Sequence, residues 1–143
     1  MTTSTPAPTE AGLDLVTRLN AYLEDVAAAL GIRRESCTVD LTGPVAARMR
    51  LNWRLPGFPE RDVDLMWHEE HGWSAAVATH SGDDHHVVVA YLGGRTVASQ
   101  PRLVARFADS LRTGEHQDCW PGPPMLRTAG GPSALAKELA AWA

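Results

Sequence analysis

The fold is decided by residues 47–55, ARMRLNWRL, in which apolar and polar side chains alternate without a break. The apolar members are Ala47, Met49, Leu51, Trp53 and Leu55, and the polar members are Arg48, Arg50, Asn52 and Arg54. Because successive side chains of a strand point to opposite faces of a sheet, one face of this segment is apolar and the other is polar. The pattern predicts a half-buried strand of an antiparallel sheet.

Shorter segments around this strand repeat the period of two. The other expected strands are 39–42, 62–67, 73–79 and 86–92, with a short sixth strand at 95–98 after a Gly-Gly pair. The sequence LPGFPER turns the chain after the central strand, since its prolines cannot continue a ladder of backbone hydrogen bonds. Consecutive strands with short connections predict a meander.

Three segments have the apolar spacing of amphipathic helices. They run from Ala11 to a glycine cap at Gly31, from Pro101 to Gly114, and from Ser133 towards the C-terminus. Residues 1–10 hold nothing to bury and are expected to form a disordered tail before a single domain at 11–143. The predicted fold is α+β: an antiparallel five- to six-stranded meander sheet packed by an N-terminal helix and two C-terminal helices.

Composition limits the function classes. The chain has 143 residues and a formal net charge of −4, with 13 Lys and Arg against 17 Asp and Glu. Binding to nucleic acid depends on cations that neutralise phosphates, so nucleic acid is an unexpected partner. No apolar stretch approaches the roughly 20 residues of a membrane span, and the N-terminus lacks a secretory signal. We therefore expect a cytoplasmic protein without a membrane partner.

The segment HEEHGW, which begins at His68, gathers polar side chains in a predicted hairpin turn. Gly72 fits the positive-φ position of a bulged turn, which places His68 across from Trp73 and leaves Glu70 and His71 at the exposed tip. The spacing differs from that of the zinc-protease motif HExxH. A solvated polar turn explains these residues, whereas the functional interpretation is a recognition tip with Trp73 as its aromatic anchor.

A row of cations, Arg48, Arg50 and Arg54, occupies the polar face of the central strand. Arg54 is expected to face Asp62 across the hairpin as an ordinary charge pair. Arg48 and Arg50 are less obviously partnered, so they are the candidates for binding an anionic ligand.

A second turn also holds residues of metal-ligand type. Besides Asp84 and His86, these are His80, Asp83 and His85, although aspartate is common in turns without any metal. The strand between the two turns separates them by about 25 Å, so one ion cannot use both. We expect no metal and no cofactor, and name these three residues as the candidates if a metal is bound.

Three sequence elements support a family resemblance. They are a first helix that ends in ALGI, the segment MRLNWRLPGFPERDVDLMWHEEHGWSAAV, and YLGG before a helix. With them, residues 13–112 resemble a small domain family of unknown function from actinomycete bacteria. The family has no assigned activity, so the resemblance implies no catalytic residue. The helix-then-meander order is also similar to that of bacterial secretion chaperones, from which this chain differs in having no helix inside the meander.

Two main hypotheses about function follow, and a metal-binding protein that uses the turn from His80 to His86 is a third possibility. The first is a non-catalytic binding or regulatory module that holds a protein partner or small ligand on its sheet face, as part of a homodimer. Its expected site residues are His68, Glu70, His71, Trp73, Arg48 and Arg50. The chain has no GxSxG or SxxK nucleophile signature and no recognisable Cys–His pair, and whether Cys37 and Cys119 form a disulfide stays open.

The alternative is a small pocket enzyme, such as an isomerase, cyclase or hydrolase. It would use a His–carboxylate pair for acid–base catalysis near neutral pH. The candidate pairs are His68 or His71 with Glu69 or Glu70, and Asp83 with His85. Such a pair requires a cavity beside it.

Overall fold

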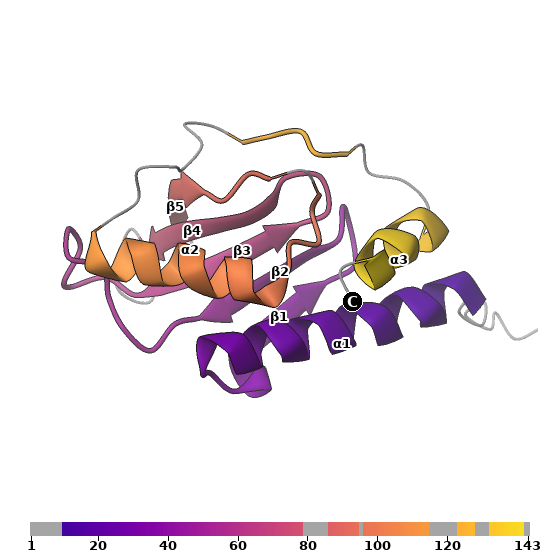
Figure 1. Ribbon diagram of the computed structural model, residues 1–143, viewed down its shortest axis with the longest axis horizontal. Helices are drawn as coiled ribbons and strands as arrows, with labels where there is room; N and C mark the ends of the chain where they lie inside the picture. Colours follow the sequence, from indigo (N-terminus) through magenta and orange to yellow (C-terminus); the bar gives the residue numbers. More distant parts are fainter. Residues whose placement is uncertain (1–9, 79–85, 95, 115–122, 128–131, 142–143) are drawn as a thin grey trace, which may run out of the picture.

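Five strands and three α-helices make up the part of the chain that the structure describes (Figure 1). This structure is a computed structural model and describes residues 10–78, 86–94, 96–114, 123–127 and 132–141. The elements are α1 (Glu10–Leu30), a short 3-10 helix (Arg34–Ser36), β1 (Cys37–Asp40), β2 (Ala46–Arg50), β3 (Val63–His68), β4 (Gly72–Ala78), β5 (His86–Tyr91), α2 (Pro101–Thr113) and α3 (Pro132–Ala141). Each strand pairs antiparallel with the next one, in the order β1-β2-β3-β4-β5. The predicted α+β class is confirmed.

The helices lie on one face of the sheet. Figure 1 shows α1 and α2 side by side in front of the strands, and α3 packs against α1. Leu19, Leu23 and Val26 of α1 are at most 1% exposed and belong to the same core as Met49 and Leu65 of the sheet. The described helices therefore leave the opposite face of the sheet, called the outer face below, uncovered.

Two tryptophans and a tyrosine form the centre of this core. Trp67 and Trp73 are paired across β3 and β4, and each is 1% exposed. Their indole N–H groups donate to the carbonyl of Val97 (2.8 Å) and to the hydroxyl of Tyr22 (2.9 Å). The Tyr22 hydroxyl donates in turn to the carbonyl of Ser99. Burial raises the pKa of Tyr22, so the hydroxyl keeps its proton and the chain of hydrogen bonds is maintained.

The central strand is shorter than predicted. It ends at Arg50. One more backbone hydrogen bond to β3 follows, from the N–H of Leu51 to the carbonyl of Val63 (2.9 Å). The chain then turns through a loop that contains Pro56 and Pro59. Although Leu55 is buried as the alternation predicted, it packs from this loop and not from the strand.

The expected sixth strand is absent from residues 96–98, and Arg95 lies outside the described residues. Val97 and Ala98 are nevertheless buried. Their segment is fixed by the indole of Trp67, which binds the carbonyl of Val97 and so uses a group that a sheet ladder would need. This segment leads directly into α2, which begins at Pro101 as predicted.

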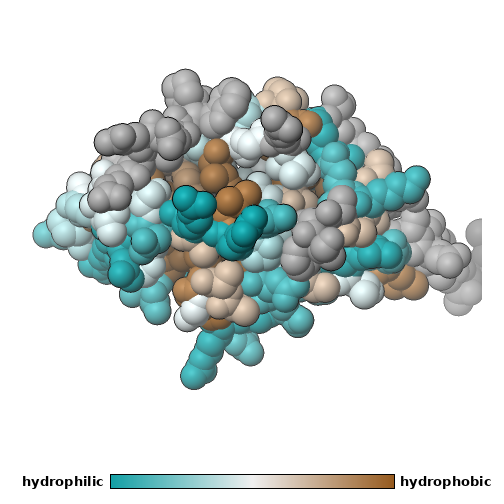
Figure 2. All heavy atoms as spheres, viewed as in Figure 1, coloured by the Kyte–Doolittle hydropathy of each residue, from teal (hydrophilic) through white to brown (hydrophobic). Residues whose placement is uncertain are grey.

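Viewed from the helix side, the surface is mixed. Figure 2 shows hydrophilic residues over much of α1 and α2 and a group of hydrophobic residues just above α2. An apolar cavity of about 160 Å³ lies at the C-terminal end of α2, between that helix, β5 and the loop after β2. Its lining includes Leu55, Phe58, Val89 and Leu111.

Candidate functional site

The outer face carries charged side chains of β2 and β3. Arg48 pairs with Met66, and Arg50 pairs with Asp64, so these four residues share one face. Their neighbours on the opposite face are buried beneath the helices, as the alternating sequence of β2 predicted. The two arginines that the sequence singled out therefore lie side by side on the face that the described helices leave open.

Asp64 is the centre of a polar cluster on this face. It is 1% exposed, and its carboxylate lies 2.5 Å from Nε of Arg50 and 2.6 Å from Nε2 of His86. Nε of Arg48 is 3.9 Å away, which is a contact between charges and too long for a hydrogen bond. Arg50 also pairs with Asp62 at 3.0 Å. Arg50 is thus more fully partnered than its sequence context suggested, whereas the only ion pair of Arg48 within the described part of the chain is this long contact.

His86 reaches Asp64 across an intervening strand. The two residues between them on β4 are Ala76, paired with Asp64, and Ala78, paired with His86. Neither methyl side chain fills the space above the sheet, so the imidazole can lie over β4. The sequence analysis grouped His86 with the residues of metal-ligand type at the second turn and did not predict its contact with Asp64, although alanines at alternate positions of a central strand are a signal that something larger covers them.

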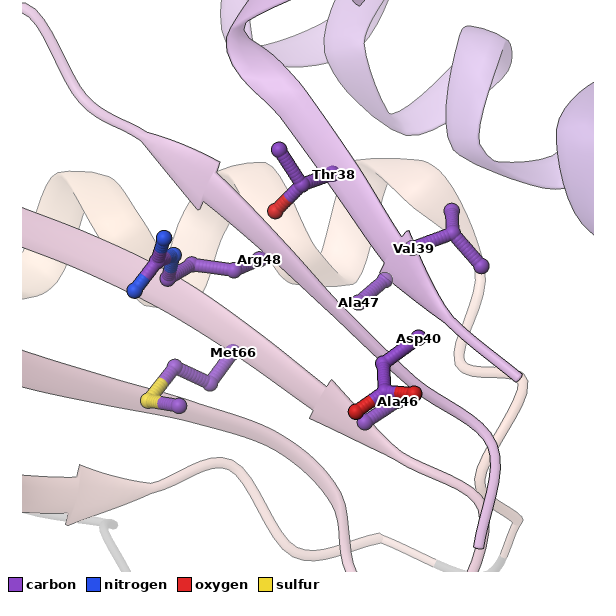
Figure 3. Close-up of a pocket in the computed structure, with 7 residues that line it drawn as sticks. All are labelled: Thr38, Val39, Asp40, Ala46, Ala47, Arg48 and Met66. Carbon is purple, nitrogen blue, oxygen red and sulfur yellow. The ribbon is translucent and has the colours of Figure 1, made fainter. Parts of the chain in front are cut away.

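A cavity of about 290 Å³ lies beside this cluster on the outer face (Figure 3). It is lined by Thr38, Val39, Asp40, Ala46, Ala47, Arg48 and Met66. Figure 3 shows Arg48 and Asp40 on opposite sides of the group, so the cavity has a cation at one side and an anion at the other. The N–H and hydroxyl of Thr42 both donate to Oδ1 of Asp40, and these bonds lower the pKa of Asp40. Its carboxylate therefore stays charged at neutral pH.

Arg54 pairs with Asp62 as expected, at 3.5 Å and with both side chains about half exposed. Its guanidinium also donates to the carbonyl of Pro59 at 3.0 Å. Since β2 ends before Arg54, the pair forms between loop residues and not across a ladder. Arg54 does not line the cavity.

The turn between β3 and β4 differs by one residue from the predicted register. Trp67 pairs with Trp73, and His68 pairs with Gly72, whose φ is +71°. Paired residues point to the same face, so Trp73 lies on the helix side with Trp67 and is buried. The prediction that Trp73 is an exposed aromatic anchor is therefore wrong. His68 keeps its place on the outer face, opposite Ala46 of the cavity lining.

His68, Glu70 and His71 lie together at this turn. One nitrogen or carboxylate oxygen from each of the three lies within 4.8 Å of those of the other two. The imidazole rings of His68 and His71 are stacked with their centres 4.5 Å apart. Burial and the neighbouring His71 lower the pKa of His68, which favours its neutral form. Imidazoles and a carboxylate are common ligands of zinc-like metals.

The same turn is fixed by the rest of the chain. The carboxylate of Glu69 is buried, where it accepts the N–H of Val45 at 2.7 Å and pairs with Arg127 at 3.4 Å. The N–H of Leu126 donates to the carbonyl of Glu70 at 2.8 Å. Glu69, named in the sequence analysis as an acid–base candidate, is thus engaged in structural contacts. The second-turn candidates His80, Asp83 and His85 lie outside the described residues.

Comparisons with known proteins place the chain in a family but give no activity. No curated protein and no solved structure matches it significantly. None of the described helices combines the length and the apolar character of a membrane span. Residues 22–110 match a family of unknown function, DUF6292, and this segment contains the whole described sheet and the turn that follows β3. Because the match covers more than half of the chain, the protein belongs to this family of unknown function, DUF6292.

Proposed function

We propose that the domain is a non-catalytic binding module that holds a small ligand, or one side chain of a protein partner, in the outer-face cavity. The observation that carries this proposal is a cavity with opposite charges, Arg48 and Asp40, on the face that the described helices leave uncovered. A pair of opposite charges favours a ligand that itself carries an anionic and a cationic group.

Arg48 is the residue best placed to bind the anionic group. Its side chain is 38% exposed, and its closest charged neighbour among the described residues is Asp64, at 3.9 Å. Guanidinium groups bind carboxylates and phosphates through paired hydrogen bonds, and none of the described residues forms such a pair with Arg48. Arg50, by contrast, forms ion pairs with Asp62 and Asp64 and does not line the cavity.

The acid–base alternative has less support. Neither of the two cavities described above is lined by His68, Glu70 or His71. A homodimer, a cytoplasmic location and an origin in actinomycete bacteria stay predictions from the sequence. Trp73→Ala cannot test binding, because it would remove a side chain from the centre of the core.

Chemical-shift mapping by NMR tests the proposal. The probes are free amino acids, their N-acetyl derivatives and their amides, so that each positive or negative charge is removed in turn. We expect the zwitterions to shift the backbone amides of Thr38, Asp40 and Met66 more than either derivative does. Arg48→Gln should abolish these shifts.

The matched control is Arg54→Gln, which removes a somewhat more exposed arginine (51% against 38% for Arg48) from outside the cavity. Its response to the probes should equal that of the unmodified protein. The proposal fails if no probe perturbs the cavity residues, or if both variants lose the response to the same extent.

A further inference from the structure

The three side chains at the turn after β3 form a donor set that the outer-face cavity does not use. His68, Glu70 and His71 are all partly exposed, and their ligand atoms lie within 4.8 Å of one another. All three lie within positions 68–71, so the turn by itself brings them close together and their closeness is not evidence of a binding site. The surrounding contacts supply the independent observations.

The first observation is the orientation of His71. Its Nδ1 lies 3.0 Å from the carbonyl oxygen of Pro124. A carbonyl can only accept, so Nδ1 carries the proton and Nε2 keeps an unprotonated lone pair. Histidines that bind metals usually donate their other ring N–H to a carbonyl or carboxylate in this way, which fixes the tautomer and the ring.

The second observation is the rigidity of the turn. Glu69 is anchored through its buried carboxylate to Val45 and Arg127. The carbonyl of Glu70 accepts the N–H of Leu126 at 2.8 Å, so the segment 123–127 holds the turn from one side. A donor set fixed before binding loses little conformational entropy when an ion arrives.

His68 requires one adjustment. Its Nδ1 accepts the backbone N–H of Glu70 at 3.0 Å, which places the ring proton on Nε2. A cation at Nδ1 must displace this N–H, which water can then bind. His71 therefore offers its lone pair without rearrangement, and His68 joins the site when that single hydrogen bond opens.

We propose that His71, Glu70 and His68 bind a divalent transition-metal ion of the zinc class, with water in the remaining position. Two imidazoles disfavour Ca²⁺ and Mg²⁺, which prefer oxygen ligands, and suit Zn²⁺. Three protein ligands and an open position are typical of zinc sites that can bind a further group. Because His68 faces Ala46 of the cavity lining, the bound ion would lie at the end of the outer face.

Titration calorimetry with Zn²⁺ on the full, untagged chain tests this proposal. We expect one ion per chain. Glu70→Gln keeps the shape of a partly exposed side chain and should weaken Zn²⁺ binding at least tenfold, and His71→Ala should do the same. Circular dichroism checks that each variant is folded, and the visible absorption of Co²⁺ in place of Zn²⁺ reports the coordination number.

Two controls separate this site from other histidines. Glu60→Gln alters an exposed carboxylate in the loop after β2 and should leave the affinity unchanged. His85→Ala removes a candidate of the other turn. The proposal is overturned if the protein binds no Zn²⁺, or if binding survives Glu70→Gln and His71→Ala and is lost in His85→Ala. Neither result depends on the outer-face ligand, since Arg48→Gln should not change Zn²⁺ affinity.

Discussion

Asp62 and Asp64 provide a matched test of how burial sets the value of a charge pair. They are two positions apart on one face, and both pair with Arg50. Asp64 is 1% exposed, whereas the side chain of Asp62 is 49% exposed. Replacing each by alanine removes the same group from two environments, so the difference between the variants reports the burial of Asp64 together with its buried partner His86.

The expected magnitudes follow from the partners. A hydrogen bond to a charged group contributes about 1.5–3 kcal/mol. Arg50 is 47% exposed and can be solvated again when Asp64 is lost, which lowers the cost, but His86 is 7% exposed and cannot. We expect Asp64→Ala to lower the free energy of unfolding by about 2 kcal/mol. Asp62→Ala should cost less than about 1 kcal/mol.

Urea unfolding, followed by tryptophan fluorescence and far-UV circular dichroism, measures both values. The m value should not change, because neither variant alters the surface exposed on unfolding. Asp64→Asn keeps an acceptor for Arg50 and should fall between the alanine variant and the unmodified protein. Equal losses from Asp62→Ala and Asp64→Ala, or a loss below about 0.5 kcal/mol for Asp64→Ala, would refute the assigned role of burial.

Three further variants or reactions test the fold around the site. Tyr22→Phe leaves the buried indole N–H of Trp73 without its acceptor, and urea unfolding should show a loss of about 2 kcal/mol. Gly72→Ala places a side chain at φ +71° and 3.0 Å from a methyl of Leu126, and its melting temperature should fall as about 1–2 kcal/mol of stability is lost. Burial raises the pKa of Cys37, so in a variant whose other cysteine is serine, alkylation should be slower than for free cysteine. Its rate should still rise at pH values where that of free cysteine has levelled off, and an equal rate would contradict the burial.

Much of the fold could be predicted because the spacing of apolar residues within each strand and helix is a local property of the sequence. The alternation through β2 defined which side chains face the helices, and Met49 is 0% exposed as expected. Pro101 begins α2, and Gly114 ends it with φ +84°. These signals depend on steric rules within a few residues, so tertiary context did not override them.

The register of the turn after β3 could not be predicted in the same way. A shift of one residue moves every side chain of a strand to the other face. The sequence allowed Trp73 to pair with His68, which would have placed the indole on the outer face. In the structure Trp73 pairs with Trp67 and its N–H binds Tyr22, a residue 51 positions earlier. That distant hydroxyl has no local signature in the sequence.

The contact between His86 and Asp64 was missed for a related reason. It crosses β4 and depends on the pairing of both β3 and β5 with that strand. The bulge between Ala75 and Ala76 changes the register of β5, and sequence alternation does not report it. A cluster assembled from separate strands becomes visible only when the sheet order and every register are known.

The two arginines of β2 differ in how much each contributes to the stability of the fold. Arg50 forms ion pairs with Asp62 and with the buried Asp64, so its positive charge stabilises the folded sheet. Among the described residues Arg48 makes one ion-pair contact, at 3.9 Å, and it is 38% exposed, so it contributes little to stability. Its replacement should leave the free energy of unfolding almost unchanged and still remove probe binding at the cavity. A large loss of stability in Arg48→Gln would instead make this arginine a structural residue, and the cavity would lose the cation on which its proposed ligand depends.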